Sequence, residues 1–104
     1  MAYRIDDVFS ALADQNRREI LLMLSDKKMT VNSIAGNFNI SRPAISKHLK
    51  VLLNTNLVST GQKGRERYYQ LNVEPLNTVR QWLKYYDKFW DKKLNQLKNY
   101  LENV

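Results

Sequence analysis

The sequence has no cysteine, and it has only three glycines and two prolines in 104 residues. Without cysteine the chain forms no disulfide and offers no thiolate to a metal ion. It also lacks any apolar run that approaches the ~20 residues needed to span a membrane. Its N-terminus shows no signal-peptide pattern. We therefore expect a cytoplasmic protein with no membrane partner.

Groups that carry catalysis are equally scarce. His48 is the only histidine, and it makes no nucleophile–base pair with Ser46, because residues two apart on a helix point to different sides. There is no glycine-rich phosphate loop, and the neighbours of His48 do not complete a zinc site. We expect no enzyme, no cofactor and no metal site, and we assign His48 a structural or phosphate-contact role.

Positive charge is plentiful, and it is concentrated in one part of the chain. The formal net charge is +7. Residues 41–73 carry six basic side chains and one acidic side chain, whereas residues 1–40 carry five of each. Residues 74–104 carry six basic and four acidic side chains. This distribution suits a polyanionic partner and indicates that residues 41–73 contact it.

The first forty residues are predicted to form three helices. Apolar residues at helical spacing predict the first helix over residues 5–13. Asp14 and Thr30 are suitable N-caps for a second and a third helix. Gly36 lies inside the third and predicts close packing there, and Asn39 suits a left-handed conformation in the turn that follows.

The next helix, from residue 41 to residue 54, has two distinct faces. Ser41 is a suitable N-cap, and Pro43 falls in the first turn, where its missing N–H costs nothing. One face carries the apolar residues Ile45, Leu49 and Leu52. The opposite face carries Arg42, Ser46, Lys47, Lys50 and Asn54. A helix with one apolar and one basic face fits the major groove of DNA, with the apolar face turned toward the protein.

A short basic hairpin follows this helix. Asn56 is expected to end the helix in a left-handed conformation. Residues 57–60 and 67–71 predict two strands, with a turn over residues 61–65. The basic side chains of the hairpin are Lys63, Arg65 and Arg67. A helix, a turn, a second helix and a hairpin in this order predict a winged helix-turn-helix.

Pro75 starts a predicted long helix that reaches residue 102. Its apolar face is rich in aromatic residues and is too large for a core of this size to cover. The first helix is also apolar, so the two helices predict a symmetric dimer interface. The residues assigned to it are Ile5, Phe9, Trp82, Tyr86, Phe89, Trp90, Leu94 and Leu97. A ligand pocket lined by the aromatic side chains is the alternative.

In these features the chain resembles the ArsR-type winged-helix transcriptional regulators. The resemblance covers residues 5–71 and rests on residues 12–21, 41–53, 56–58 and 68–71 in that order. It implies a dimer formed by the first and last helices, recognition helices that read half-sites about one helical turn apart, and repression, often of the regulator's own operon. By position it implies that DNA meets Ser41, Arg42, Pro43, Ala44, Ser46, Lys47 and Lys50 of the recognition helix and Lys63, Arg65 and Arg67 of the wing.

The DNA-facing residues divide into two predicted roles. Arg42, Ser46 and Lys47 are assigned to base edges, since Arg and Lys favour guanine. Lys50 and the three wing residues are assigned to phosphates, whose contacts fix position without reading sequence. Many ArsR-type members sense metals through cysteines or through histidine and acidic pairs on the last helix, which this chain lacks. It is more similar to cysteine-free autorepressor-type members.

The sequence thus predicts a mainly α (α+β) winged helix-turn-helix with about five helices and a two-stranded wing. We expect a single domain over residues 1–104, in which residues 1–13 and 75–104 supply dimerisation helices. The expected function is sequence-specific binding of double-stranded DNA as a homodimeric repressor that does not respond to metal. Two alternatives stay open: a winged-helix module that binds an acidic protein, and a regulator that senses a small apolar ligand at the aromatic helix.

Overall fold

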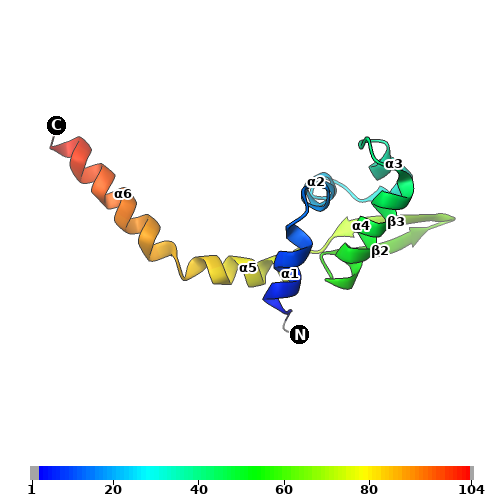
Figure 1. Cartoon of the computed structure of the whole chain (residues 1–104), viewed down its shortest axis with the longest axis horizontal. Helices are drawn as coiled ribbons and strands as arrows, with labels where there is room; N and C mark the ends of the chain where they lie inside the picture. Colours follow the sequence, from blue (N-terminus) through cyan, green and yellow to red (C-terminus); the bar gives the residue numbers. More distant parts are fainter. Residues whose placement is uncertain (1–2, 104) are drawn as a thin grey trace.

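One small core organises most of the chain, and the last helix projects from it (Figure 1). The computed structural model describes residues 3–103. Within them it has six helices and a three-stranded antiparallel sheet, which confirms the predicted mainly helical winged fold. The helices are α1 (Ile5–Leu12), α2 (Gln15–Leu24), α3 (Val31–Ala35), α4 (Arg42–Asn54), α5 (Glu74–Lys84) and α6 (Asp87–Glu102). The strands are β1 (Met29–Thr30), β2 (Val58–Lys63) and β3 (Glu66–Leu71).

Polar side chains cap three of the helices at the predicted positions. Each cap accepts a hydrogen bond from a backbone N–H of the first turn, which would otherwise lack a partner in the helix. The bonds run from Arg17 N to Asp14 Oδ1 (3.1 Å), from Ser33 N to Thr30 Oγ1 (3.2 Å) and from Ala44 N to Ser41 Oγ (3.3 Å). These caps fix where α2, α3 and α4 begin and therefore where the helix-turn-helix lies.

The core lies between helices α1 to α4 and the sheet. From α4 it takes Ile45, Leu49 and Leu52, each at most 1% exposed, as predicted. The other buried apolar residues are Val8, Ala11, Ile20, Leu21, Leu24, Met29, Ile34, Leu57 and Val58. Because one whole stripe of α4 is buried in this way, the opposite stripe of the same helix is held at a fixed position on the surface.

The wing is longer than predicted. Strand β2 extends to Lys63, which lies opposite Glu66 of β3. Only residues 64 and 65 form the turn, so the predicted turn over residues 61–65 is too long. Gly64 supplies the turn with a φ of 63°, a conformation that glycine adopts without strain.

A third strand joins the wing to the helices. Strand β1 pairs antiparallel with β3, with Met29 opposite Tyr69, so the strand order is β1-β3-β2. Strands β2 and β3 form the predicted two-stranded wing, and β1, which was not predicted, is the third strand of the sheet. A strand of two residues is too short to show an alternating pattern, so the sequence carried no signal for it.

Two of the three predicted special backbone positions differ from expectation. Gly36 follows the last residue of α3, and a Cβ there would meet only backbone oxygens of that helix, at 3.5 and 3.6 Å. The prediction of close helix packing at Gly36 is therefore wrong. In residues 3–103 the only positive φ outside glycine is that of Asn56, at 60°. The left-handed conformation is thus confirmed for Asn56 and wrong for Asn39, because the loop between α3 and α4 is long enough to turn without it.

We expect Asn56→Ala to lower the free energy of unfolding by about 1 kcal/mol, because alanine tolerates the left-handed conformation less well than asparagine. Chemical denaturation measures this loss. The control is Asn56→Gly, since glycine adopts the same φ without a Cβ clash and should unfold at the wild-type midpoint or above it. An equal loss in both variants would show that the asparagine side chain, rather than the backbone conformation, stabilises this turn.

The C-terminal region consists of two helices, so the prediction of one helix over residues 75–102 is wrong. Helix α5 ends at Lys84 and α6 begins at Asp87. The turn at residues 85 and 86 redirects the chain, and α6 leads away from the rest of the molecule (Figure 1). Of the predicted domain over residues 1–104 and its dimerisation segments, residues 1, 2 and 104 lie outside the described part.

Helix α6 makes the molecule elongated. Its 16 residues include none that is buried. The radius of gyration is 18.3 Å and the longest dimension is 64 Å, whereas a folded chain of about 100 residues typically has a radius near 13 Å. The core and wing are therefore an ordinary small fold, to which α6 adds an arm with no cover of its own.

Candidate nucleic-acid interface

The exposed face of α4 carries the side chains that the sequence assigns to DNA. It presents Arg42, Ser46, Lys47 and Lys50 to solvent. Ser41 and Pro43 are exposed at the start of the helix, and Ala44 is half-buried. The Ser41 hydroxyl accepts the Ala44 N–H, so Ser41 contributes to this surface chiefly by starting the helix. The free polar groups of α4 are therefore concentrated on one face and near its N-terminal end.

The wing adds a second set of basic side chains, Lys63, Arg65 and Arg67, which are all exposed. The guanidinium of Arg67 lies 5.5 Å from the centre of the Tyr69 ring, at the distance of a cation–π contact. Near the tip, Tyr68 donates a hydrogen bond to Glu66 at 2.6 Å, and this bond raises the pKa of Tyr68. These contacts orient the strand side chains and leave the basic groups of the wing facing solvent.

A hollow of about 300 Å³ lies between the recognition helix and the wing. Arg42 of α4 borders it together with Arg65 and Arg67 of the wing. The remaining lining residues are Thr30, Val31, Asn32 and Glu66. The structure thus brings together three of the predicted site residues, whereas Lys47, Lys50 and Lys63 do not line the hollow. Sequence reasoning missed Thr30 and Asn32 as part of this surface, since both precede the recognition helix.

The six basic side chains of α4 and the wing have no acidic partner within residues 3–103. The ion pairs in that part of the chain involve Arg4, Arg17, His48 and Lys98 instead. Like charges gathered on one surface repel one another, and an anionic partner relieves that repulsion. Their arrangement therefore favours binding of a polyanion over a structural role for these charges.

Behind this surface, Arg17 connects α1 with the recognition helix. Its Nε donates to the Ala11 carbonyl at 2.7 Å, and its Nη2 donates to the Ser10 carbonyl at 3.1 Å. Its Nη1 lies 3.4 Å from Nδ1 of His48, in the middle of α4. The side chains of Arg17 and His48 are only 16% and 18% exposed. Arg17 therefore lies between two helices rather than on the surface.

Sequence reasoning missed Arg17, although a signal was present. Arg17 and Arg18 lie in the first turn of α2, where the helix dipole disfavours positive charge. Two cations at that place indicate that their side chains bind the C-terminal carbonyls of another helix. Arg18 does so as well, because its Nη1 donates to the Leu12 carbonyl at 2.7 Å. Together the two side chains satisfy the last carbonyls of α1.

Asp14 completes the cluster around His48. Its Oδ1 lies 3.9 Å from His48 Nδ1, and the same oxygen accepts the Arg17 N–H. Burial acts to raise the pKa of Asp14, but the hydrogen bond from the Arg17 backbone and the charges of His48 and Arg17 outweigh it. The pKa of Asp14 is therefore lowered. His48 thus faces α2 and its charged groups.

The residues assigned to the dimer interface form a chain of contacts from α1 to α6. Phe9 packs edge-on against Trp82, with ring centres 5.2 Å apart, and Trp82 packs against Tyr86 at 5.1 Å. Ile5 and Phe9 are half-buried. The others are exposed to 45% (Trp82), 37% (Tyr86), 53% (Phe89), 69% (Trp90), 61% (Leu94) and 54% (Leu97). A continuous apolar surface therefore runs along α1, α5 and α6.

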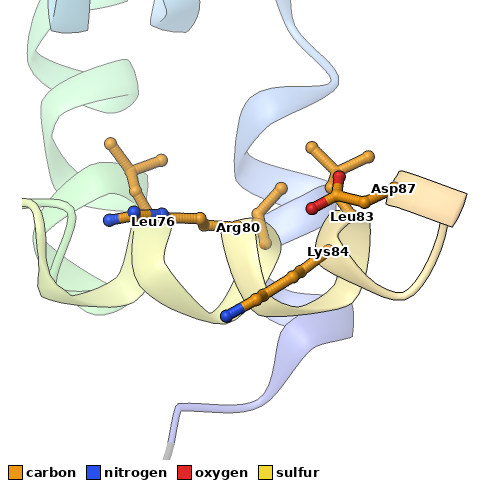
Figure 2. Close-up of a pocket in the computed structure, with 6 residues that line it drawn as sticks. Leu76, Arg80, Leu83, Lys84 and Asp87 are labelled. Carbon is orange, nitrogen blue, oxygen red and sulfur yellow. The ribbon is translucent and has the colours of Figure 1, made fainter. Parts of the chain in front are cut away.

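A second hollow, of about 450 Å³, runs along α5 (Figure 2). Its lining is Leu76, Val79, Arg80, Leu83 and Lys84 of α5 and Asp87 of α6. All but one of these residues come from a single helix, so the hollow is a surface groove rather than an enclosed pocket. Since a small apolar ligand needs most of its surface covered, this groove alone does not favour the ligand-sensing alternative.

Two further properties of residues 3–103 bear on the kind of site. These residues contain no group of three or more His, Asp or Glu side chains placed to hold a metal ion. In the same part of the chain, no helix combines the length and the apolar character that crossing a membrane requires. The surface features that stand out are therefore the basic face of α4 and the wing and the apolar face of the outer helices.

A winged fold with unpaired basic charge on its recognition helix and wing defines a DNA-binding protein. A family model described as "Bacterial regulatory protein, arsR family" matches residues 14–60. The transcriptional repressor SdpR of Bacillus subtilis (strain 168) is 40% identical over 79 residues, which are 76% of this chain and 88% of SdpR. The chain belongs to the arsR family of bacterial regulatory proteins.

Other relatives extend the similarity beyond residues 14–60. The HTH-type transcriptional regulator Rv2034 of Mycobacterium tuberculosis is 39% identical over 89 residues, which are 86% of this chain and 80% of that protein. The solved structure of an ArsR-like transcriptional regulator from Rhodococcus sp. RHA1 is 35% identical, with a TM-score of 0.72, and covers 91% of this chain and 90% of that one. These relatives are transcriptional regulators and not enzymes, and they confirm the family resemblance seen in the sequence.

Proposed function

We propose that this chain is a homodimeric repressor that binds double-stranded DNA sequence-specifically, acts on DNA upstream of its own gene, and does not respond to metal ions. The observation that carries the proposal is the joint surface of α4 and the wing, where six basic side chains have no acidic partner among the described residues. The name of its relative SdpR supports the repressor role.

The basic residues divide by their place on this surface. Arg42, Ser46 and Lys47 lie in the first turns of α4, and the N-terminal residues of a recognition helix are those that reach base edges in the major groove. Lys50 lies further along the helix and is assigned to phosphate. Lys63, Arg65 and Arg67 are assigned to phosphates beside the groove, since charged contacts to the backbone position the protein.

The hollow between α4 and the wing supports this arrangement. Arg42 and the two wing arginines border the same space, so a DNA strand that passes between helix and wing would meet all three. Guanidinium groups bind phosphate oxygens in a bidentate way, which makes arginine the preferred residue at such a place. Arg42 would thus contact the DNA in the major groove, and Arg65 and Arg67 would contact the backbone of the same segment.

The dimer is proposed to form through residues 1–13 and 75–104. Helix α6 has 16 residues and buries none of them, whereas helices in proteins gain most of their stability from packing of an apolar face. Covering an apolar side chain of the size of Leu94 or Leu97 contributes about 1.5–3 kcal/mol. A second copy that covers α1, α5 and α6 would therefore stabilise a helix that the monomer leaves unsupported.

The spacing of the apolar residues on α6 also favours a second helix as the partner. Trp90, Leu94, Leu97 and Leu101 alternate by four, three and four residues, which is the spacing of the seam of a coiled coil. Tyr100 and Phe89 flank this seam, and both are exposed. A helix of another copy of this chain offers the same seam in return, as a symmetric dimer requires.

Independence from metal ions is supported by the side chains themselves. The chain has no cysteine and one histidine. That histidine, His48, is in contact with Arg17 and Asp14, and the guanidinium at 3.4 Å from its Nδ1 would repel a cation there. A metal ion therefore has no favourable ligand set at the one imidazole of the chain.

The proposal is tested by fluorescence anisotropy with the DNA upstream of this protein's gene and a scrambled duplex, across a salt series. We expect selective binding to the upstream duplex, a linear fall of log affinity with log salt, and no change on adding Zn²⁺ or a chelator. Equal weak binding to both duplexes would contradict action on its own gene. No binding to either duplex at low salt would contradict DNA binding and favour the protein-contact alternative.

Lys63→Ala should weaken binding to all duplexes alike and should lower the magnitude of the salt slope by about 2, because one phosphate contact is lost from each of the two wings of the dimer. The same anisotropy series measures both quantities. Lys92→Ala is the matched control, since it removes an equal charge from α6 and should change neither. A loss confined to the upstream duplex would show that Lys63 reads bases instead.

A further inference from the structure

Arg17 has a role beyond stabilising α2. Two of its nitrogens donate to the carbonyls of Ser10 and Ala11, and the third lies against His48 of α4. One rigid guanidinium thus joins the end of α1 to the middle of the recognition helix. The backbone of Arg17 is also held in place, because its N–H donates a hydrogen bond to the Asp14 carboxylate. Movement of α1 relative to α4 would break at least one of these bonds.

The chemistry of the α1 end explains why an arginine stands at this place. The last carbonyls of a helix lack partners within the helix and carry partial negative charge. Helix α1 has no basic residue in its own last turn, so Arg17 supplies the cation. A lysine could neutralise the same charge, but it has no planar fork to hold two carbonyls and a third partner in fixed directions.

The contact with His48 is directional. Arginine only donates hydrogen bonds, so a hydrogen bond in this contact runs from the Arg17 guanidinium to Nδ1 of His48. The charged groups that face this ring are Arg17, at 3.4 Å, and Asp14, at 3.9 Å. His48 lies on α4 between Lys47 and Leu49, so its contact with Arg17 adds a polar restraint, at the level of the DNA-facing side chains, to a helix that its buried stripe already orients.

We propose that Arg17 is a positioning residue for DNA binding, which, through His48, fixes the recognition helix relative to α1 and so sets the distance between the two recognition helices of the dimer. This inference rests on the proposed function as a dimeric DNA-binding regulator. Helix α1 carries Phe9, whose ring packs on Trp82 of α5. The Arg17–His48 contact is thus a polar link between the proposed dimer surface and the helix that reads DNA, in addition to the shared apolar core.

A firm link has a specific consequence for binding. A dimer that holds its recognition helices at one distance binds two half-sites at the correct spacing. It binds more weakly when one base pair is inserted or removed between the half-sites. When the link is loosened, each recognition helix still fits its half-site, but the pair tolerates a wrong spacing. Loss of Arg17 should therefore change spacing selectivity and leave the contact with a single half-site intact.

The test compares the operator with versions that have one base pair inserted or removed between the half-sites, together with a duplex that holds one half-site. Arg17→Lys and His48→Leu should each reduce the spacing discrimination by about fivefold, within the range of typical coupling between sites. Neither should change affinity for the single half-site. His48→Asn should retain discrimination, because Asn Oδ1 provides an acceptor close to the position of Nδ1.

Arg18→Lys is the matched control, since Arg18 also bonds to the end of α1 but, within residues 3–103, forms no hydrogen bond or ion pair with α4. It should keep the wild-type spacing preference. Unchanged discrimination in Arg17→Lys and His48→Leu, or an equal loss on the single half-site and on the operator, would overturn the inference and leave the proposed function standing. Failure of the wild-type protein to prefer its operator would overturn the proposed function, and the inference with it.

Discussion

Trp90→Ala should raise the dissociation constant of the dimer by a factor on the order of a thousand, because each copy loses one tryptophan from the proposed seam and a tryptophan at the centre of an interface contributes about 2 kcal/mol or more. Trp90 is 69% exposed in the single chain, so little of this loss concerns the fold of the monomer. Sedimentation over a range of concentrations measures the shift directly.

Asn99→Ala on the same helix is the control for this prediction. With 3.6 residues per turn, Asn99 lies about half a turn away from the seam of Trp90, Leu94 and Leu97. It should leave the dimer unchanged. An intact dimer of Trp90→Ala at low micromolar concentration would show that the exposed face of α6 is not the interface, whatever the state of Asn99→Ala.

Arg42→Ala should lower operator affinity by roughly a hundredfold, since a lost bidentate contact to a base costs about 1–3 kcal/mol and the dimer carries two such contacts. It should also relax the preference for one base pair in each half-site. Binding to a panel of single base-pair operator variants, at one salt concentration, measures both changes. Arg42 is exposed and forms no ion pair within residues 3–103, so its removal leaves no buried charge unpaired.

Lys84→Ala serves as the charge control for Arg42→Ala, because it removes one positive charge from α5, outside α4 and the wing. It should leave the base preference as it is. If Arg42→Ala weakened binding to every operator variant equally, Arg42 would be a phosphate contact together with Arg65 and Arg67, with which it shares the hollow. The assignment of Arg42 to a base edge would then be wrong.

The helix-turn-helix could be predicted from the sequence because its signals are local. Ser41, Thr30 and Asp14 cap helices by accepting N–H groups three residues away, and such bonds depend on the nearby sequence alone. The buried stripe of α4 follows in the same way from the period of a helix. Asn56 was identified because few residues tolerate a positive φ.

The break between α5 and α6 could not be predicted, because the apolar pattern continues across it. Leu76, Leu83 and Trp90 follow one another at intervals of seven residues, as they would on one unbroken helix. Neither glycine nor proline marks residues 85 and 86. The single hint is Asp87, an acidic residue at a position where the heptad pattern would place an apolar one. An acidic side chain suits the first turn of a new helix.

The Arg17–His48 contact could not be predicted for a different reason. The two residues are 31 positions apart, and no pattern of a single sequence shows which of several polar side chains meet across such a distance. The surface residues of α4 and the wing were assigned from the face of a helix and from the family resemblance. Their separate roles in binding bases or phosphates stay predictions.

Helix α6 is left uncovered by the rest of residues 3–103, and this makes the activity of the regulator depend on its own abundance. If only a second copy covers it, the active form depends on the square of the monomer concentration, and the occupancy of a binding site rises more steeply than the amount of protein. The apparent melting temperature should likewise increase with concentration. Monomers at low abundance would present a bare apolar helix to proteases and would be removed first. A regulator of its own gene built in this way would lose repression abruptly, rather than gradually, as its level falls.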